Sequence, residues 1–435
     1  MKWLLGTLLL LVVAVALGME LLIYTAYVLL AMLVVSRALA RRWIEGLAAE
    51  RECSRLSAQV GDKVAVAVTV INKGRLPVPW VLAEDVLPWQ AIVERPPRIK
   101  VTGPRRLIAM LRPGGRKTMF YQLHFQMRGY IQAGPLLLES GDLFGLHRRY
   151  RVATDPHYVL VYPRVVPLAG YDLASRRPIG EIRLASRLYE DPTRISGVRD
   201  YQPGDALNRV HWRATARTGK LHSKTYEPST IAGATVLLDF HAAAYPNRNE
   251  PYRSELAVTT VASLANAVYQ MGQQVGLVTN GRDAADRIRI EGWQSEYRDR
   301  RLARESVAMR DQSGRLRPLV VDTRRGADQL LRILETLARV ELTDGLDFSQ
   351  LVAETIGRLP RDATVVAVLP DVSPQTAFAL STLKRRGLAV TAVVIAVEDD
   401  EWWDASRLLL RERIDFRRIA REEDLAVLGR ADLVG

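Results

Sequence analysis

The chain has 435 residues, of which 25% are charged and 48% hydrophobic. This mixture is typical of folded proteins, and the length predicts two or three domains. The formal net charge of +13 suits a nucleic acid, an anionic membrane or an acidic protein as partner, so charge alone does not choose among them. The single cysteine, Cys53, excludes an internal disulfide.

The N-terminal region is almost free of charge. Between Trp3 and Ser36 the only charged residue is Glu20. A single helix of this length would be about 51 Å long, well beyond the roughly 30 Å of a bilayer's hydrocarbon core. The run divides naturally at Gly18 into two shorter legs, Trp3–Gly18 and Leu21–Ser36. It therefore predicts a transmembrane helical hairpin within residues 1–40.

Basic residues flank this hairpin on both sides. Lys2 precedes it, and Arg37, Arg41 and Arg42 follow it. By the positive-inside rule we expect both ends on the cytoplasmic side of the inner cell membrane, with cytoplasmic soluble domains. A cleaved signal peptide ending near Ala16 is the rival interpretation, but the second apolar leg follows at once. The basic stretch of residues 37–51 suits anionic lipid.

Residues 50–165 show strand patterning. Val64, Val66, Val68 and Val70 alternate with smaller or polar residues, which indicates a strand with one buried face. Turn signals rich in glycine, proline and asparagine recur between further short apolar runs. The pattern predicts a small β-sandwich.

Residues 230–435 follow a different pattern. Short apolar runs such as Ala234–Phe240 and Ala363–Asp371 alternate with helical segments such as Arg253–Met271 and Pro374–Gly387. Continuous apolar strands separated by helices are typical of a parallel sheet covered on both faces. We therefore expect a doubly wound α/β domain here.

Residues 190–229 link the two domains and contain an unusual basic segment, Arg199–Leu221. Asp205 follows a Pro-Gly turn and is placed to cap a helix beginning at Ala206. Gly219 is placed to end it. The spacing of four would align three arginines on one face of that helix, which are Arg209, Arg213 and Arg217.

Two roles are open for these arginines. The favoured one is structural: they pair with carboxylates of the same chain, with Arg213 as a buried clamp between the domains and Trp212 as an anchor against one of them. The candidate carboxylates are Glu181, Glu190, Asp191 and Asp239. The other role is recognition of an external anion or acidic partner, because the guanidinium fork donates two hydrogen bonds at once.

The same segment resembles the signature of a known family. Gly197–Ser229 is similar to the motif of the domain of unknown function 58 family, and residues 128–146 look like the region upstream of that motif. The matching positions that we take as binding residues are Tyr201, Pro203, Gly204, Asp205, Arg209, His211, Trp212, Arg213 and Arg217.

The resemblance implies a membrane-anchored protein whose α/β domain is similar to von Willebrand factor type A. It also implies partnership with MoxR-type AAA+ ATPases, and in some members with transglutaminase-like membrane proteins. Family members are thought of as adaptors of such ATPases. We therefore expect a cytoplasm-facing adaptor or scaffold, with the lipid bilayer and a protein as its partners.

A type A domain binds a divalent cation through Asp-x-Ser-x-Ser after its first strand. Asp239 occupies the first position, but His241 and Ala243 replace the two serines. Asp371, after a later strand, is a second candidate ligand at the same edge of the sheet. Without the hydroxyls we predict a degenerate site that binds no metal.

Enzymatic chemistry finds little support. We found no nucleophile elbow, phosphate-binding loop or zinc motif, and no cofactor is expected. Cys53 lies outside the α/β domain and is expected to be an inert apolar residue. No nucleic-acid motif accompanies the basic charge. Two alternatives to the adaptor stay open: a metal-dependent enzyme or ligand-binding protein using Asp239 and Asp371, and binding of anionic lipid or nucleic acid by basic surfaces.

Overall fold

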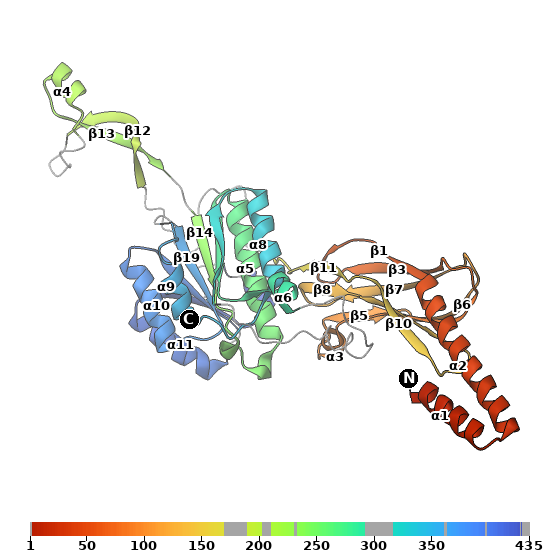
Figure 1. Cartoon of the computed structure of the whole chain (residues 1–435). Helices are drawn as coiled ribbons and strands as arrows, with labels where there is room; N and C mark the ends of the chain where they lie inside the picture. Colours follow the sequence, from red (N-terminus) through yellow and green to blue (C-terminus); the bar gives the residue numbers. More distant parts are fainter. Residues whose placement is uncertain are drawn as a thin grey trace. The chain divides into compact units, whose positions relative to one another are not determined.

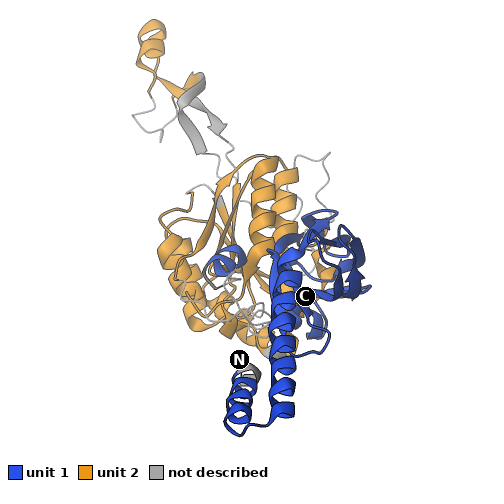
Figure 2. Ribbon diagram, turned by 45° about the vertical axis from the view of Figure 1, so that its right-hand side comes forward, with its two compact units in different colours: residues 1–163, 284–311 blue, residues 164–283, 312–435 orange. Residues whose placement is uncertain are grey.

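A computed structural model describes residues 2–168, 189–201, 210–229, 233–291, 316–360, 363–395, 398–426 and 428. The chain divides into two compact units, coloured separately in Figure 2. Unit 1 comprises residues 1–163 and 284–311, and unit 2 comprises residues 164–283 and 312–435.

Unit 1 begins with two helices that pack against each other, α1 (Lys2–Ala16) and α2 (Glu20–Gly46). The break between them falls where the sequence predicts it, and Gly18 adopts a positive φ of 65° there. By length and composition, α2 is the one helix among the described residues that is long and apolar enough to cross a membrane. The apolar part of α1, Leu5–Ala16, is shorter.

Helix α2 extends further than the sequence analysis expected. The predicted second leg ends at Ser36 and is followed by a basic segment, but the helix continues to Gly46 and passes directly into strand β1 (Leu47–Cys53). Its second half carries a buried stripe with helical spacing, made by Ser36, Ala40 and Trp43. This part of the helix packs against strands β9 (Leu136–Gly141) and β10 (Arg148–Thr154), which explains why the helix does not end at the first arginine.

The rest of unit 1 is rich in short strands, as predicted for residues 50–165. In chain order the elements are β2 (Ser57–Gln59), β3 (Lys63–Asn72), β4 (Val78–Asp85), α3 (Trp89–Val93), β5 (Ile99–Thr102), β6 (Arg106–Leu111), β7 (Arg116–Phe125), β8 (Gly129–Ala133), β9 (Leu136–Gly141), β10 (Arg148–Thr154), β11 (His157–Tyr162) and α6 (Ala284–Glu291). The strands form three sheets with orders β1-β3-β7-β5, β10-β9-β4-β6 and β2-β11-β8. The alternating valines of β3 are fully buried, so the predicted period of two is confirmed.

Unit 2 contains a two-stranded antiparallel ladder and an α/β domain. The ladder consists of β12 (Tyr189–Asp200) and β13 (His222–Ser229), with the short helix α4 (Trp212–Thr218) between them in the chain. Its strands occupy much of the region that the sequence analysis assigned to a linker and family motif.

The α/β domain has a six-stranded sheet with the order β17-β15-β14-β19-β20-β21. Its strands are β14 (Gly233–Leu238), β15 (Gln274–Thr279), β17 (Leu319–Arg324), β19 (Ala363–Leu369), β20 (Val390–Ile395) and β21 (Asp415–Ile419). Five strands are parallel, as predicted, whereas the edge strand β17 runs antiparallel to β15.

Helices cover both faces of this sheet (Figure 1). One hydrophobic core joins the sheet to α5 (Tyr252–Gln270), α8 (Ala327–Arg339) and α12 (Glu422–Leu425). A second core joins the opposite face to α9 (Phe348–Thr355), α10 (Pro374–Arg385) and α11 (Asp399–Arg411). Two 3₁₀ turns (Ala242–Ala244 and Asn247–Asn249) and a small ladder of β16 (Arg282–Asp283) with β18 (Val340–Glu341) complete the unit. The sheet order reverses at β14 and β19, which is where an open α/β sheet forms a crevice at its carboxyl edge.

Candidate functional site

The family-like signature lies around α4, and five of its nine predicted binding residues are described. Tyr201, His211, Trp212, Arg213 and Arg217 are placed. The four other predicted binding residues lie outside the described residues, and they are Pro203, Gly204, Asp205 and Arg209.

Ala206, the predicted first residue of the helix, lies outside the described residues. The prediction of one continuous helix from there to Arg217 is wrong, because Val210 and His211 are not helical and α4 begins at Trp212. Val210 is only 1% exposed and bridges to Ser223 of β13, so the backbone just before the helix is extended. His211 caps the helix instead, with its Nδ1 accepting a hydrogen bond from the Ala214 N–H at 3.0 Å. Gly219 ends the helix in the left-handed conformation, as predicted.

The arginine stripe of α4 therefore consists of two residues, Arg213 and Arg217, and both are exposed. Trp212 is 67% exposed. Neither Trp212 nor Arg213 is buried by the described residues around it, and the roles of Arg213 as a clamp and Trp212 as an anchor between the domains stay predictions. Leu221 (47%) and Val198 (43%) are also exposed, so large apolar side chains accompany the two arginines.

His222 fixes the base of α4, and the sequence analysis missed it. Its Nε2 lies 2.7 Å from the Thr218 hydroxyl, and its backbone N–H donates to the Thr215 hydroxyl at 3.1 Å. Its Nδ1 lies 3.1 Å from the Asp200 carboxylate. The helix is therefore held by polar contacts on its inner side while its aromatic and basic residues remain accessible.

A second polar cluster lies at the carboxyl edge of the α/β sheet. Asp239 directly follows β14 and is 5% exposed. Its Oδ1 accepts hydrogen bonds from Asn280 Nδ2 at 2.8 Å and from the His241 N–H at 3.2 Å. Asn280 also accepts from the Phe240 N–H at 2.6 Å and donates to the Leu346 carbonyl at 2.9 Å. Asn280 therefore ties three loops together, and its place after β15 is the signal that could have found it.

The pKa values of two carboxylates in this cluster, Asp239 and Asp347, are shifted in opposite directions. Burial raises the pKa of Asp239, and the hydrogen bond from Asn280 offsets only part of that effect. For Asp347, burial also raises the pKa, but hydrogen bonds from Ser349 and Gln350 outweigh it and hold the pKa below its ordinary value. Asp347 caps α9 through these bonds. It is therefore a structural carboxylate that the sequence analysis did not single out.

Asp371 follows β19 at the same edge of the sheet and is exposed. Its Oδ1 accepts a hydrogen bond from the adjacent Val372 N–H at 2.7 Å. Arg253, only 1% exposed, donates to the Pro370 carbonyl and lies 3.8 Å from the Glu401 carboxylate. The buried Arg253 of α5 thus holds the loop that carries Asp371 through its hydrogen bond to the Pro370 carbonyl.

The residues at this edge do not fit a divalent metal. One oxygen of the buried Asp239 already accepts two N–H groups, and the hydroxyls that a hard cation would require are replaced by His241 and Ala243. Within the described ranges, no group of three or more His, Cys, Asp or Glu side chains could hold a metal ion. The cluster is a hydrogen-bond network that connects the loops after β14 and β15 with the segment before α9.

Cys53 and His157 lie together in unit 1, with 3.7 Å between the sulfur and Nδ1. Burial raises the pKa of the Cys53 thiol, and burial together with the nearby Arg51 lowers the pKa of His157. Both shifts favour the neutral forms. A reactive thiolate–imidazolium pair is therefore disfavoured.

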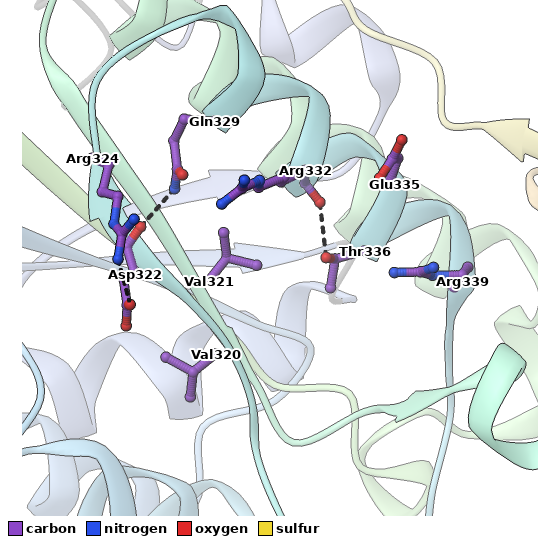
Figure 3. Close-up of a pocket in the computed structure, with 9 residues that line it drawn as sticks. All are labelled: Val320, Val321, Asp322, Arg324, Gln329, Arg332, Glu335, Thr336 and Arg339. Atoms are coloured by element: carbon purple, nitrogen blue, oxygen red, sulfur yellow. Dashed lines mark hydrogen bonds and ion pairs between the residues drawn. The ribbon is translucent and has the colours of Figure 1, made fainter.

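A pocket of about 260 Å³ lies between the edge strand β17 and helix α8 (Figure 3). Gln329 forms part of its wall and donates to the carbonyls of Val275 at 2.9 Å and Asp322 at 2.6 Å. Its lining includes three arginines and two carboxylates, so the lining side chains carry a net positive charge that favours an anion. The lining residues are Val320, Val321, Asp322, Arg324, Gln329, Arg332, Glu335, Thr336 and Arg339.

Comparison with known proteins supports the family resemblance. Residues 197–317 match the model of the family described as "Protein of unknown function DUF58". An uncharacterized protein of Bacillus subtilis, YeaD, is 25% identical over 259 residues. That alignment covers 59% of this chain and 62% of the Bacillus protein, which is less than two thirds of its length.

Solved structures share only partial likeness with the chain. The CARDB domain of the PF1109 protein from Pyrococcus furiosus matches 26% of this chain and 91% of its own length, with 14% identity and a TM-score of 0.19. Proximal thread matrix protein 1 from the mussel byssus matches 45% of this chain and 46% of its own, with 10% identity and a TM-score of 0.25.

Proposed function

We propose that this chain, a protein of the DUF58 family, is a membrane-anchored adaptor that holds a protein partner at the cytoplasmic surface. The observation that carries the proposal is the exposure of the signature on α4. Trp212 is 67% exposed and lies beside the exposed Arg213 and Arg217. Tryptophan and arginine are the residues most enriched at the energetic centres of protein interfaces.

The partner that we propose is a MoxR-type AAA+ ATPase, as the family resemblance implies, with a transglutaminase-like membrane protein as a further member of the assembly. An acidic surface on that partner would suit the two arginines. The α/β domain would act as a von Willebrand factor type A-like scaffold. Its doubly wound sheet, with β14 and β19 at the reversal, supports that part of the proposal.

The anchor in this proposal is the pair α1 and α2, which cross the inner membrane as two spans. The basic residues on both sides of the pair support a cytoplasmic location for everything after Arg37. A reporter enzyme that is active only outside the cytoplasm, fused after Gly435, is therefore expected to be silent. An active fusion would refute the topology.

Capture of the partner tests the adaptor role. The full chain, solubilised mildly from membranes, is expected to retain a MoxR-type ATPase, which mass spectrometry identifies. The double variant Trp212→Ser with Arg213→Glu is expected to lose it. The matched control is Trp89→Ser with Arg75→Glu, which changes an equally exposed tryptophan and an exposed arginine in unit 1. Equal capture by all three proteins would contradict the assignment of the signature as the binding surface.

A further inference from the structure

The turn between β9 and β10 exposes an apolar tip. Leu143 is 72% exposed, Phe144 64% and Leu146 37%. Turns of this kind are usually built from polar residues, glycine and proline. Gly145 provides the positive φ of 72° that this turn requires, and its three apolar neighbours face solvent. The tip is therefore an apolar surface that the described residues of unit 1 leave exposed.

Two contacts place this tip along helix α2. The Ser36 hydroxyl donates to Asp142 Oδ2 at 2.5 Å, at the start of the turn. At the other end of the hairpin, Arg151 Nη1 lies 3.3 Å from the carbonyls of Glu45 and Leu47. The β9–β10 hairpin thus lies beside the second half of α2 (Figure 1). The hydrogen bond between Ser36 and Asp142 places its turn level with Ser36.

Ser36 is also the last residue of the uncharged run that begins after Glu20. In a helix that crosses the membrane, this position marks the edge of the hydrocarbon core, because Arg37 follows it. The tip residues lie in the turn itself, at this same edge. If α2 crosses the membrane, the exposed side chains of the tip therefore lie at the boundary between the headgroups and the hydrocarbon core.

Hydrogen bonds hold the turn in this position. Asp142 is 3% exposed and accepts from the His147 N–H at 2.9 Å as well as from Ser36. Trp80 Nε1 lies 3.4 Å from the Asp142 carbonyl. Burial raises the pKa of Asp142, but the hydrogen bonds from Ser36 and His147 outweigh it and lower the pKa. The apolar tip is thus presented by a hydrogen-bonded turn.

We propose that Leu143, Phe144 and Leu146 insert into the lipid surface beside α2 and form a separate, monotopic membrane contact. The proposal rests on the proposed crossing of the bilayer by α2. An exposed basic rim accompanies the tip and suits anionic lipid headgroups. The rim consists of Arg37, Arg148 and Arg149.

Depth-dependent fluorescence quenching tests this contact in the full chain. Cys53 is replaced by alanine, and single cysteines at Phe144, Val28 or Phe120 are labelled with an environment-sensitive dye. The proteins are reconstituted into vesicles of phosphatidylcholine and phosphatidylglycerol that carry a nitroxide lipid, labelled either near the headgroup for Phe144 and Phe120 or deep in the acyl chain for Val28. The label at position 144 tests whether the tip contacts lipid, and the label at position 28 tests whether α2 lies in the bilayer. Phe120 is the matched control, since it is 67% exposed on β7.

We expect nitroxide lipid to quench the Phe144 label about twofold or more relative to the Phe120 label, because an interfacial side chain lies at the headgroup–acyl boundary. A quenched Val28 label with an unquenched Phe144 label would overturn the lipid contact and leave the anchor intact. Val28 and Phe144 both unquenched would refute the membrane anchor, and the tip contact with it. A label at Leu143→Cys repeats the test at a second exposed position, and failure to quench it beside a quenched Val28 label would also overturn the contact.

Discussion

Arg51 and Asp85 form an ion pair in unit 1 whose two side chains have no exposed surface. Arg51 Nε donates to Asp85 Oδ2 at 2.9 Å, and the Tyr121 hydroxyl donates to the same oxygen at 2.6 Å. Arg51 also donates to the Asp155 carbonyl at 2.9 Å. The pair joins β1, β4 and β7 and the turn before β11, so four segments depend on it.

Breaking this pair from one side should destabilise unit 1 strongly. In Arg51→Met the Asp85 carboxylate stays buried without its cation, and we expect a loss of about 3–5 kcal/mol in the free energy of unfolding. Chemical denaturation of the purified chain measures it. The double variant Arg51→Met with Asp85→Leu should lose less, because neither charge remains buried.

The matched control is Arg55→Met, which breaks an exposed pair with Asp62. Surface pairs contribute little, so we expect a change within about 1 kcal/mol. If Arg51→Met and Arg55→Met cost the same, the buried pair does not have the role that its burial indicates.

Gly134 is expected to tolerate no side chain. Its φ of +97° is unfavourable for other residues, and a Cβ would collide with the Arg51 guanidinium. Gly134→Ala should therefore cost more than the roughly 1–2 kcal/mol of the left-handed backbone alone. Gly145 also has a positive φ, of +72°, but no atom lies near the position of a Cβ. Gly145→Ala therefore measures the backbone cost without a steric clash. Thermal unfolding of both variants checks the difference, and equal losses would contradict the steric argument.

The stability of the α/β domain should depend on the ionisation of Asp239. Its folded-state pKa is raised by burial, so its stabilising contribution is full below the unfolded pKa of about 3.9 and is lost as the pH rises through the folded value. Asp239→Asn should remove this slope. Unfolding measured across that pH range checks it.

Asp347 is a control for which we expect the opposite dependence of stability on pH. Its folded-state pKa is lowered, so its contribution is present above the unfolded pKa and is lost as the pH falls through the folded value. In Asp347→Asn the loss of stability on acidification should therefore be smaller. A pH profile in which both variants change in the same direction would refute the assignment of the two carboxylates.

The signature residues should matter little for folding. Because Trp212 and Arg213 are exposed, Trp212→Ser and Arg213→Ala are each expected to change the free energy of unfolding by no more than about 0.5 kcal/mol. A clamp between domains would instead cost several kcal/mol and increase proteolysis. Limited proteolysis beside denaturation separates these results, and a strongly destabilised Arg213→Ala would support the structural role instead.

Much of the fold was predictable because hydrophobic periodicity reports burial directly. The alternating valines of β3 and the apolar runs of β14 and β19 identified strands that the structure confirms. The antiparallel direction of β17 was not predictable, since strand direction depends on the connection and not on composition. The extension of α2 past Ser36 was missed because its arginines suggested a membrane boundary, whereas the buried stripe through Trp43 continues the helix.

The candidate site was less predictable because it depends on contacts between distant residues. Asp239 and Asp371 were found from their places after strands, but Asn280, which binds Asp239, was not. The helix of the signature begins late because Val210 pairs with Ser223, a contact that the local sequence does not encode. Local capping rules placed the end of α4 correctly at Gly219, but they did not identify His211 as its N-cap.

The direct passage from Gly46 of α2 into Leu47 of β1 has a mechanical consequence. No linker residue separates helix from strand, and the second half of α2 packs against β9 and β10, so we expect little bending where they meet. Any tilt of the helix is therefore transmitted to the attached strands as a rigid rotation. If α2 spans the bilayer, a change in bilayer thickness that tilts the helix would also change the angle at which unit 1 faces the membrane.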